Sequence, residues 1–361
     1  MNKKIVISGW YGFGNIRDEA ILQAMIDTFE KEYPKCNITV LSYNPEYTKR
    51  VQRVDAVHQI PIGKKSLLKN IIFLRWIATL KAIKNCDIFI MGGGGFLSDW
   101  QPEVPKGWLK QMKLAKFFGK KTMLYGIGAG PFLTDKGKKT TKYYIDNFVD
   151  KITVRDMESY RQLVENVKVN KTVEIEIDPV AKMKVVKYID RDDVSDNSIA
   201  MIYTEYFKSK YFEDIHHKKW GLLFDAFCSQ INAVLEYGFS PKLVFFQKNI
   251  EENLANKFIQ IFGDKVKIYF PNDYKEAVKM MNKSDAIISF RLHGNILAYA
   301  MKKPFLPIIY HHKTAGFLEH IDYLHGNCIL EVGDGKNWKD EKIVPQEWFD
   351  KTSLFLESIK K

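Results

Sequence analysis

Short apolar strands alternate with helical segments along the whole chain of 361 residues. This alternation is typical of α/β proteins, in which helices connect neighbouring parallel strands. The predicted strands are rich in Ile, Val, Leu and Phe, as expected where helices cover both faces of a sheet. In the first half they lie at 5–9, 38–42, 87–91, 122–125 and 152–154. In the second half they lie at 199–203, 242–247, 266–269, 286–289, 305–309 and 328–331.

A charged stretch at residues 187–197 has almost no apolar pattern and interrupts the alternation. A chain of this length exceeds what one hydrophobic core usually organises, so two domains are expected. We predict a Rossmann-like domain at 1–186, a linker at 187–197, a second Rossmann-like domain at 198–343 and a closing C-terminal helix at 344–361. Two Rossmann-like domains facing each other across a cleft form the GT-B architecture.

The composition excludes several classes of protein. With 46% hydrophobic and 27% charged residues, the chain is typical of globular proteins. Its four cysteines are widely spaced and form no CxxC pair, which argues against a disulfide framework and against a zinc site. No apolar signal region precedes the first predicted strand, so we expect a cytoplasmic protein.

The net charge of +12 is concentrated in residues 61–121, where twelve Lys or Arg residues accompany three acidic ones. Two basic helices predicted there, at 64–84 and 106–121, also carry Leu, Ile, Phe and Trp. Such helices suit the inner face of an anionic membrane, and they equally suit a core-packed position with a solvated basic edge. No recognition helix, zinc finger or RNP-like strand indicates nucleic acid binding.

The segment from Ser289 to Asn295 follows the predicted strand 286–289 and precedes a predicted helix. Open α/β sheets bind their ligands at this end of their strands. Arg291 offers a fork of donors suited to phosphate or carboxylate, and His293 can transfer a proton near neutral pH. The pair indicates an anionic substrate beside a proton donor; the alternative is a helix-capping Arg and a packed His.

A glycine-rich segment at 9–20 lies between the first predicted strand and the first predicted helix, and it ends in Asp18, Glu19 and Ala20. Glycines allow the backbone to approach a ligand, and a helix N-terminus offers free amide donors. The two carboxylates would repel a phosphate and suit sugar hydroxyls better. An N-cap is an equally good interpretation of Asp18.

Two further glycine segments follow predicted strands. In the run at 92–95, we expect Gly93 and Gly94 to allow close approach of the backbone to a ligand or to the other domain. In Gly126–Pro131, Gly128 belongs to alternating glycines that form a nest of amides near the same sheet edge.

Two more cationic side chains follow strands. Arg155 is a candidate second anion fork, and the alternative is a surface ion pair with Asp156. Lys313 is a candidate positive contact near Arg291. It follows His311 and His312, where we expect no metal because adjacent side chains on a loop rarely converge on one ion.

Taken together, these segments resemble the polysaccharide pyruvyltransferase family over nearly the whole chain, with Ser289-x-Arg291-Leu292-His293 as the most specific motif. The family includes the pyruvyltransferases of bacterial secondary cell-wall polymers. The resemblance implies a GT-B-like fold with the acceptor on the N-terminal domain and the donor on the C-terminal domain. It also implies transfer of the enolpyruvyl unit of phosphoenolpyruvate to two sugar hydroxyls, which forms a cyclic ketal without cofactor or metal.

The resemblance also implies roles for single residues. The donor's carboxylate and phosphate would be bound by Arg155, Arg291 and Lys313, with His293 as general acid and Asp18 orienting or deprotonating the acceptor hydroxyl. These cationic groups are expected to converge in the groove between the domains. The remaining substrate contacts would come from Glu19, Gly93, Gly94, Gly128 and Ser289.

The acceptor is less well defined than the donor. Galactose and N-acetylmannosamine derivatives both stay open, and the basic helices are compatible with a lipid-diphosphate-linked sugar at the membrane. His311 stands where family members usually have an Asp, which is a departure relevant to the acceptor.

Two other functions stay open from the residues alone. A glycosyltransferase on the same scaffold would use a nucleotide sugar and contact its ribose with an acidic residue. Glu251 and Glu252 are the candidates, although their position at a polar helix start favours charges that stabilise the helix terminus. A non-catalytic glycan-binding protein would not need Arg155, Arg291 and His293.

Overall fold

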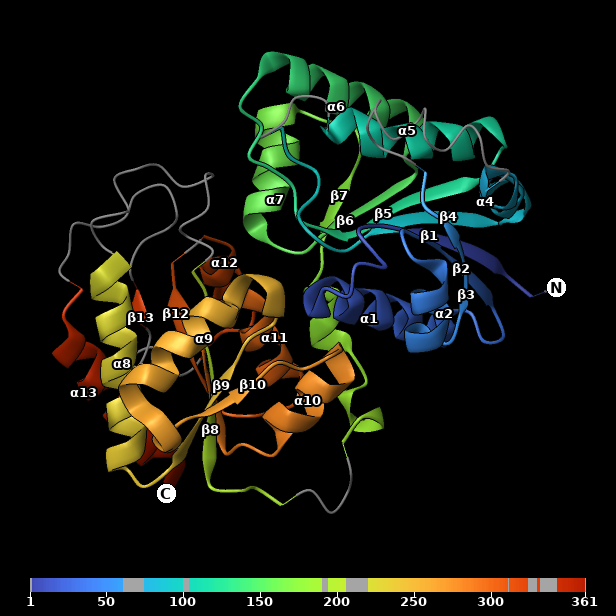
Figure 1. Ribbon diagram of the computed structural model, residues 1–361. Helices are drawn as coiled ribbons and strands as arrows, with labels where there is room; N and C mark the ends of the chain where they lie inside the picture. The colour runs from blue at the N-terminus through green and yellow to red at the C-terminus, as the bar shows by residue number, and fades with distance from the viewer. Residues whose placement is uncertain are drawn as a thin grey trace. The chain divides into compact units, whose positions relative to one another are not determined.

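The chain forms two compact units, Met1–Met183 and Lys184–Lys361. The computed structural model describes residues 2–60, 75–99, 104–189, 194–205, 220–310, 312–323, 330–331 and 343–360, without the side chains of Arg75, Trp220 and His312. Each unit is built on a parallel sheet with helices packed against it (Figure 1). The boundary falls just before the predicted linker, whose described residues belong to the second unit.

The first unit holds a seven-stranded parallel sheet in the order β3-β2-β1-β4-β5-β6-β7. Its strands are β1 (Lys4–Ser8), β2 (Asn37–Ser42), β3 (Asp55–His58), β4 (Ile88–Gly92), β5 (Lys121–Ile127), β6 (Lys151–Val154) and β7 (Val173–Ile175). The strand order reverses between β1 and β4, and open α/β sheets bind ligands at such a switch point. β3 and β7 are absent from the predicted strands because they are too short for a clear apolar pattern.

Helices cover both faces of this sheet. Figure 1 shows α5 and α6 on one face, with α1 and α2 on the other. The helices are α1 (Ile16–Glu32), α2 (Pro45–Gln52), α4 (Arg75–Asn85), α5 (Val104–Phe117), α6 (Asp135–Phe148) and α7 (Met157–Arg161), followed by a π-helix at Gln162–Val167 and a 3-10 turn at Pro179–Lys182; a further 3-10 turn at Val185–Lys187 lies at the start of the second unit. The interpretation of Asp18 as the cap of α1 is wrong, because Asn15 Oδ1 accepts the Arg17 amide at 3.1 Å.

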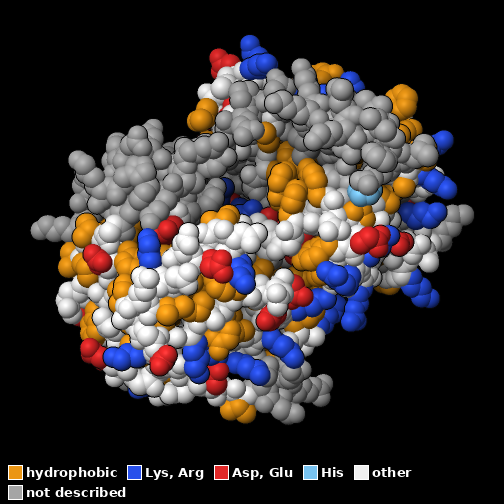
Figure 2. Space-filling view, in the orientation of Figure 1, with side chains coloured by type: hydrophobic (Ala, Val, Ile, Leu, Met, Phe, Trp, Pro, Cys, Tyr) orange, Lys and Arg blue, Asp and Glu red, His pale blue; other side chains and the backbone are white. Residues whose placement is uncertain are grey.

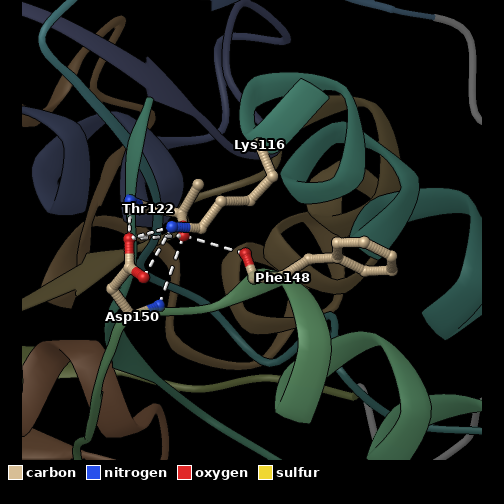
Figure 3. Close-up of polar contacts among 4 residues, drawn as sticks. All are labelled: Lys116, Thr122, Phe148 and Asp150. Atoms are coloured by element: carbon tan, nitrogen blue, oxygen red, sulfur yellow. Dashed lines mark hydrogen bonds and ion pairs between the residues drawn. The ribbon is translucent and has the colours of Figure 1, made fainter. Parts of the chain in front are cut away.

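The basic helix α5 is tied to the sheet at its C-terminal end. Lys116 Nζ lies 2.6 Å from both carboxylate oxygens of Asp150 (Figure 3). Asp150 also accepts the Thr122 amide at 2.9 Å, and Thr122 Oγ1 donates to the Phe148 carbonyl at 2.8 Å. Burial opposes the charge of Asp150, but the Lys116 ammonium and the Thr122 amide together lower its pKa. Lys116, one lysine of this basic segment, therefore forms an ion pair within its own unit.

The second unit holds a six-stranded parallel sheet in the order β10-β9-β8-β11-β12-β13. Its switch point lies between β8 and β11. The strands are β8 (Ser198–Ile202), β9 (Ser240–Val244), β10 (Lys267–Tyr269), β11 (Ala286–Ser289), β12 (Phe305–Ile309) and β13 (Leu330–Glu331). The helices are α8 (Trp220–Glu236), α9 (Lys248–Phe262), α10 (Tyr274–Asn282), α11 (Leu292–Ala300), α12 (His312–His320) and α13 (Pro345–Lys360), with a 3-10 turn at Gly263–Lys265.

The core of the second unit is rich in aromatic rings. Tyr203 packs with ring centroids 4.7 Å from Phe227 and 4.8 Å from Phe290. Phe290 lies inside the Arg–His motif, so this buried ring anchors the motif to the core. The predicted closing helix is α13, which packs against α8.

Where the structure describes the chain, none of its helices combines the length and the apolar character needed to traverse a membrane. The first part of the predicted basic helix, residues 64–74, lies outside the described residues.

Candidate functional site

The Arg–His motif forms a tight turn at the carboxyl end of β11. Ser289 Oγ donates to the Arg291 carbonyl at 2.9 Å, and the Gly294 and Asn295 amides donate to the same oxygen at 2.9 and 3.2 Å. A methyl group on Gly294 would lie 2.2 Å from Ser289 Oγ, so the turn leaves no room for a larger residue. Ser289 is fully buried and holds this turn. Its predicted substrate contact stays a prediction.

The guanidinium of Arg291 is held by a buried carboxylate. Arg291 Nη2 forms an ion pair with Glu251 Oε1 on α9, and Glu251 Oε2 accepts the Gln247 amide at 2.9 Å. The Glu251 side chain is 4% exposed and the Arg291 side chain 19%. Arg291 Cζ also lies 5.9 Å from the centroid of the Phe246 ring. Glu251 therefore orients the Arg291 fork, a role that sequence analysis missed because the two residues are far apart in the chain.

Arg291 retains donor capacity beyond this ion pair. Among the described residues, Arg291 Nε has no hydrogen-bond partner. Although Arg291 occupies the N-cap position of α11, its side chain makes no capping hydrogen bond. The capping interpretation is therefore wrong, and the partly exposed fork remains suited to an anion.

His293 and Lys313 start neighbouring helices at the same sheet edge. His293 lies in the first turn of α11 and is 5% exposed, while Lys313 lies in the first turn of α12 and is half-buried. Because β11 and β12 are adjacent parallel strands, the helices that follow them begin at one edge. Ser289, Arg291 and His293 share one turn, and Lys313 follows the adjacent strand.

Asp18 is a buried carboxylate at the start of α1, close to the glycine run after β4. It is 3% exposed, and its Oδ1 accepts from Arg17 Nε at 3.1 Å. Its Oδ2 is buried and has no hydrogen-bond partner among the described residues. A methyl group on Gly94 would lie 3.8 Å from Asp18 Oδ1, in ordinary van der Waals contact, so Gly94 lies next to this carboxylate; its φ of +91° favours glycine.

Glu19 holds the glycine-rich loop in place. Its Oε1 accepts the Gly12 amide at 2.8 Å, and its Oε2 accepts from Gln52 Nε2 at 3.1 Å. Burial raises the pKa of Glu19 more than these hydrogen bonds lower it. Both oxygens are used by the chain itself, so the predicted substrate contact of Glu19 stays a prediction.

Gly93 is required by packing within its own unit. It has φ +63°, and a methyl group there would lie 1.8 Å from Ile21 Cγ2 on α1. Its amide donates to the Tyr125 carbonyl at 3.0 Å. The close approach of backbone expected at Gly93 is thus made to α1; its contact with a substrate stays a prediction.

Arg155 is buried in a network of carboxylates. Its Nη1 lies 3.0 Å from Asp178 Oδ2, and its Nε lies 3.5 Å from Asp156 Oδ2. The side chains of Arg155 and Asp178 are 5% and 2% exposed. The interpretation as a surface pair with Asp156 is therefore wrong. A methyl group on Gly128 would lie 3.0 Å from Arg155 Nη2, so Gly128 makes room for the guanidinium.

Asp178, the nearer of the two carboxylates to Arg155 in this network, is not among the residues predicted from the sequence. The only local signal was its position before Pro179, which starts a 3-10 turn whose Val180 amide donates to Asp178 Oδ1 at 3.0 Å. Since Asp178 engages the guanidinium, donor binding by Arg155 stays a prediction.

The described residues contain no group of three or more His, Cys, Asp or Glu side chains placed to hold a metal ion. His311 and the pair His216–His217 lie outside the described residues, and the side chain of His312 is not described.

Solved structures with this fold define the class to which the chain belongs. A UDP-GlcNAc 2-epimerase from Neisseria meningitidis bound to UDP-GlcNAc is 14% identical with a TM-score of 0.59, covering 100% of this chain and 92% of its own. A putative UDP-N-acetylglucosamine 2-epimerase from Listeria monocytogenes is 13% identical with a TM-score of 0.56, covering 99% and 91%. The ADP-heptose LPS heptosyltransferase II of E. coli is 12% identical with a TM-score of 0.52, covering 99% and 100%. The chain is therefore an α/β protein of the GT-B type.

The family is defined more narrowly by sequence. A family model for polysaccharide pyruvyl transferases matches residues 18–312, from the carboxylate at the start of α1 to the start of α12. The chain belongs to the polysaccharide pyruvyl transferase family. A search of curated proteins finds no match.

Proposed function

We propose that this protein transfers the enolpyruvyl unit of phosphoenolpyruvate to two hydroxyls of one sugar, forming a cyclic pyruvate ketal in the synthesis of a bacterial surface polysaccharide. The observation that carries the proposal is the Arg291 fork, oriented by the buried Glu251 and set two residues before His293. Family membership supports it independently.

The proposed donor is a small molecule with a carboxylate and a phosphate. Arg291 and Lys313 supply positive charge at the edge where β11 and β12 end, and a guanidinium fork pairs well with either anion. His293 is the proposed general acid, because two anionic groups beside an imidazole favour its protonated form.

In the proposed reaction a proton adds to the methylene carbon of the donor, and the neighbouring carbon becomes an oxocarbenium-like centre. One sugar hydroxyl adds to this carbon and loses its proton. The carbon–oxygen bond to phosphate breaks, inorganic phosphate leaves with the electron pair, and the second hydroxyl closes the ring with loss of its proton. One donor and one diol thus give one ketal and one phosphate.

In the first unit, Asp18 is the residue proposed to contact the sugar acceptor. Its buried Oδ2 has no hydrogen-bond partner among the described residues and can accept from a sugar hydroxyl, orienting or deprotonating it. Because the acidic residue Glu19 lies beside Asp18, a phosphate is disfavoured at this position. This supports assigning the sugar acceptor to the first unit.

The acceptor is proposed to be lipid-diphosphate-linked and reached at the inner face of the membrane. On α4, Ile77 is 59% exposed and Leu80 is 40% exposed, and Phe117 at the end of α5 is 82% exposed. Exposed apolar side chains among lysines suit an anionic membrane surface. Binding to vesicles containing anionic lipid, and its loss in Ile77→Glu, tests this contact.

The test of the proposed function follows phosphate release. The protein is incubated with phosphoenolpyruvate and methyl glycosides of galactose or N-acetylmannosamine. Acceptor-dependent phosphate supports pyruvyl transfer. Release of nucleoside diphosphate from a sugar nucleotide would support a glycosyltransferase, and sugar binding without turnover would support a glycan-binding protein.

We expect His293→Ala to lower kcat by about 10²–10⁴-fold while donor affinity stays within about tenfold, because a general acid acts mainly in the transition state. His320→Ala is the matched control, since His320 is exposed at the end of α12. Donor titration shows that the variant is folded. Unchanged kcat in His293→Ala would remove this residue from the mechanism.

A further inference from the structure

Exposed aromatic rings gather after β1 in the first unit. Trp10 and Phe13 stack with ring centroids 4.7 Å apart, and Phe13 lies 4.4 Å from the ring of Tyr43. We call Trp10, Phe13 and Tyr43 the aromatic platform. Trp10 is 44% exposed and Phe13 50%, so both rings offer surface to a ligand. Figure 2 shows that hydrophobic side chains reach the surface in several places on the face it draws, so exposure alone does not define a site.

The platform is held in place by its own loop. The Tyr43 amide donates to the Tyr11 carbonyl at 3.0 Å, and the Gly12 amide donates to Glu19 Oε1 at 2.8 Å. A methyl group on Gly12 would lie 2.2 Å from Ser42 Oγ, so the loop packs closely on the end of β2. A ligand that binds fixed rings loses less free energy to ordering than one that binds mobile rings.

A series of side-chain contacts, one of them through the buried ring of Trp108, links the platform to the surroundings of the Asp18 carboxylate. Trp10 lies 6.2 Å from the Trp108 ring, and Trp108 lies 4.8 Å from the Phe96 ring. A methyl group on Gly94 would lie 3.8 Å from both Phe96 Cδ1 and Asp18 Oδ1. Phe96 and Asp18 therefore both flank Gly94, and this 3% exposed carboxylate has an Oδ2 that lacks a hydrogen-bond partner among the described residues.

This combination fits a sugar ring. One face of a pyranose presents C–H groups, which pack on the negative face of an aromatic ring, while the hydroxyls at its edge donate to a carboxylate. A phosphate would be repelled by Asp18 and Glu19, and a hydrocarbon chain would gain nothing from a carboxylate.

We infer that the aromatic platform binds a pyranose ring of the acceptor, with Trp10 and Phe13 as specificity-determining residues. This inference deepens the proposed function and rests on it for the identity of the acceptor. The exposed ring surfaces select sugars with a continuous C–H face, and Asp18 selects a hydroxyl at the edge.

The kinetic experiment compares Trp10→Ala and Phe13→Ala with the wild type, using phosphoenolpyruvate and the two methyl glycosides. We expect the KM for the glycoside to rise about tenfold in each variant, equivalent to about 1.4 kcal/mol of binding free energy. The KM for phosphoenolpyruvate and the kcat at saturating glycoside should stay within about twofold, since the proposed donor contacts lie in the second unit. Trp10→Phe should restore most of the glycoside affinity.

Tyr143→Ala is the matched control. Tyr143 is 52% exposed on α6 and contacts two other rings, Tyr144 and Phe148, at 5.4 and 5.7 Å. This variant lacks an exposed aromatic ring that is far from the platform in the sequence. An equal rise in glycoside KM in this variant would overturn the inference.

A second measurement separates this inference from the proposed function. Glycoside binding is measured by calorimetry without donor. If the wild type transfers pyruvyl groups but Trp10→Ala keeps the wild-type KM for glycoside, the platform is refuted and the function stands. If no transfer occurs but glycoside binding is lost in Trp10→Ala, the function is refuted and the platform stands. Absence of glycoside binding by the wild type would also refute the platform.

Discussion

Replacing Arg291 tests whether its buried partner Glu251 depends on it. In Arg291→Ala the Glu251 carboxylate, 4% exposed, would keep only the Gln247 amide as a hydrogen-bond partner among the described residues. Breaking a buried ion pair from one side costs about 3–5 kcal/mol, and the 19% exposure of Arg291 favours the lower end or somewhat less. We therefore expect the free energy of unfolding to fall by about 2–3 kcal/mol.

The double variant Arg291→Ala/Glu251→Gln removes the buried charge while leaving an amide oxygen for the Gln247 amide. Its free energy of unfolding should return to within about 1 kcal/mol of the wild type. The assay is urea unfolding followed by circular dichroism, with thermal melting as a second readout, in phosphate-free buffer because phosphate is expected to bind the fork. The single variant should melt about 5–10 °C lower.

The same pair of variants isolates the donor role of Arg291. If Arg291 contacts phosphoenolpyruvate, both variants should lose about 1.5–3 kcal/mol of donor binding in calorimetry, whatever their stability. Equal stability of the single and double variants would refute the dependence of Glu251 on Arg291. Wild-type donor affinity in the stable double variant would refute the donor contact.

Two further predictions concern the first unit. Gly93→Ala should cost about 1–3 kcal/mol more than Gly119→Ala in urea unfolding, because both have positive φ but only Gly93 meets Ile21; equal losses would contradict the packing argument. Because burial raises the pKa of Glu19, the folded protein binds this proton more tightly than the unfolded chain, and this stabilising contribution is lost as the pH rises through the raised pKa. Relative to wild type, Glu19→Gln should therefore gain stability as the pH rises above the ordinary glutamate pKa of about 4.3, and a difference that does not change with pH would count against it.

Much of the fold followed from local patterns. The apolar runs of β1, β4 and β11 are recognisable because strands covered on both faces need continuous apolar sequence. The edge strands β3 and β7 were missed, since runs of four and three residues carry little periodic signal. The site followed the same rule. The positions of Arg291 and His293 after a strand could be predicted from the sequence, but the ion pair between Arg291 and Glu251 could not.

The sequence by itself determined the alternation of strands and helices, the placement of Arg291 and His293 after β11, and the resemblance to the family. These depend on residues close together in the chain, whose spacing reflects the periods of helix and strand. Only the tertiary structure decided that Glu251 holds Arg291, that Asp178 engages Arg155, and that Trp10 stacks on Phe13 beside Tyr43. The ion pairs and the contacts with Tyr43 join residues brought together by strand order and packing, which local spacing does not encode.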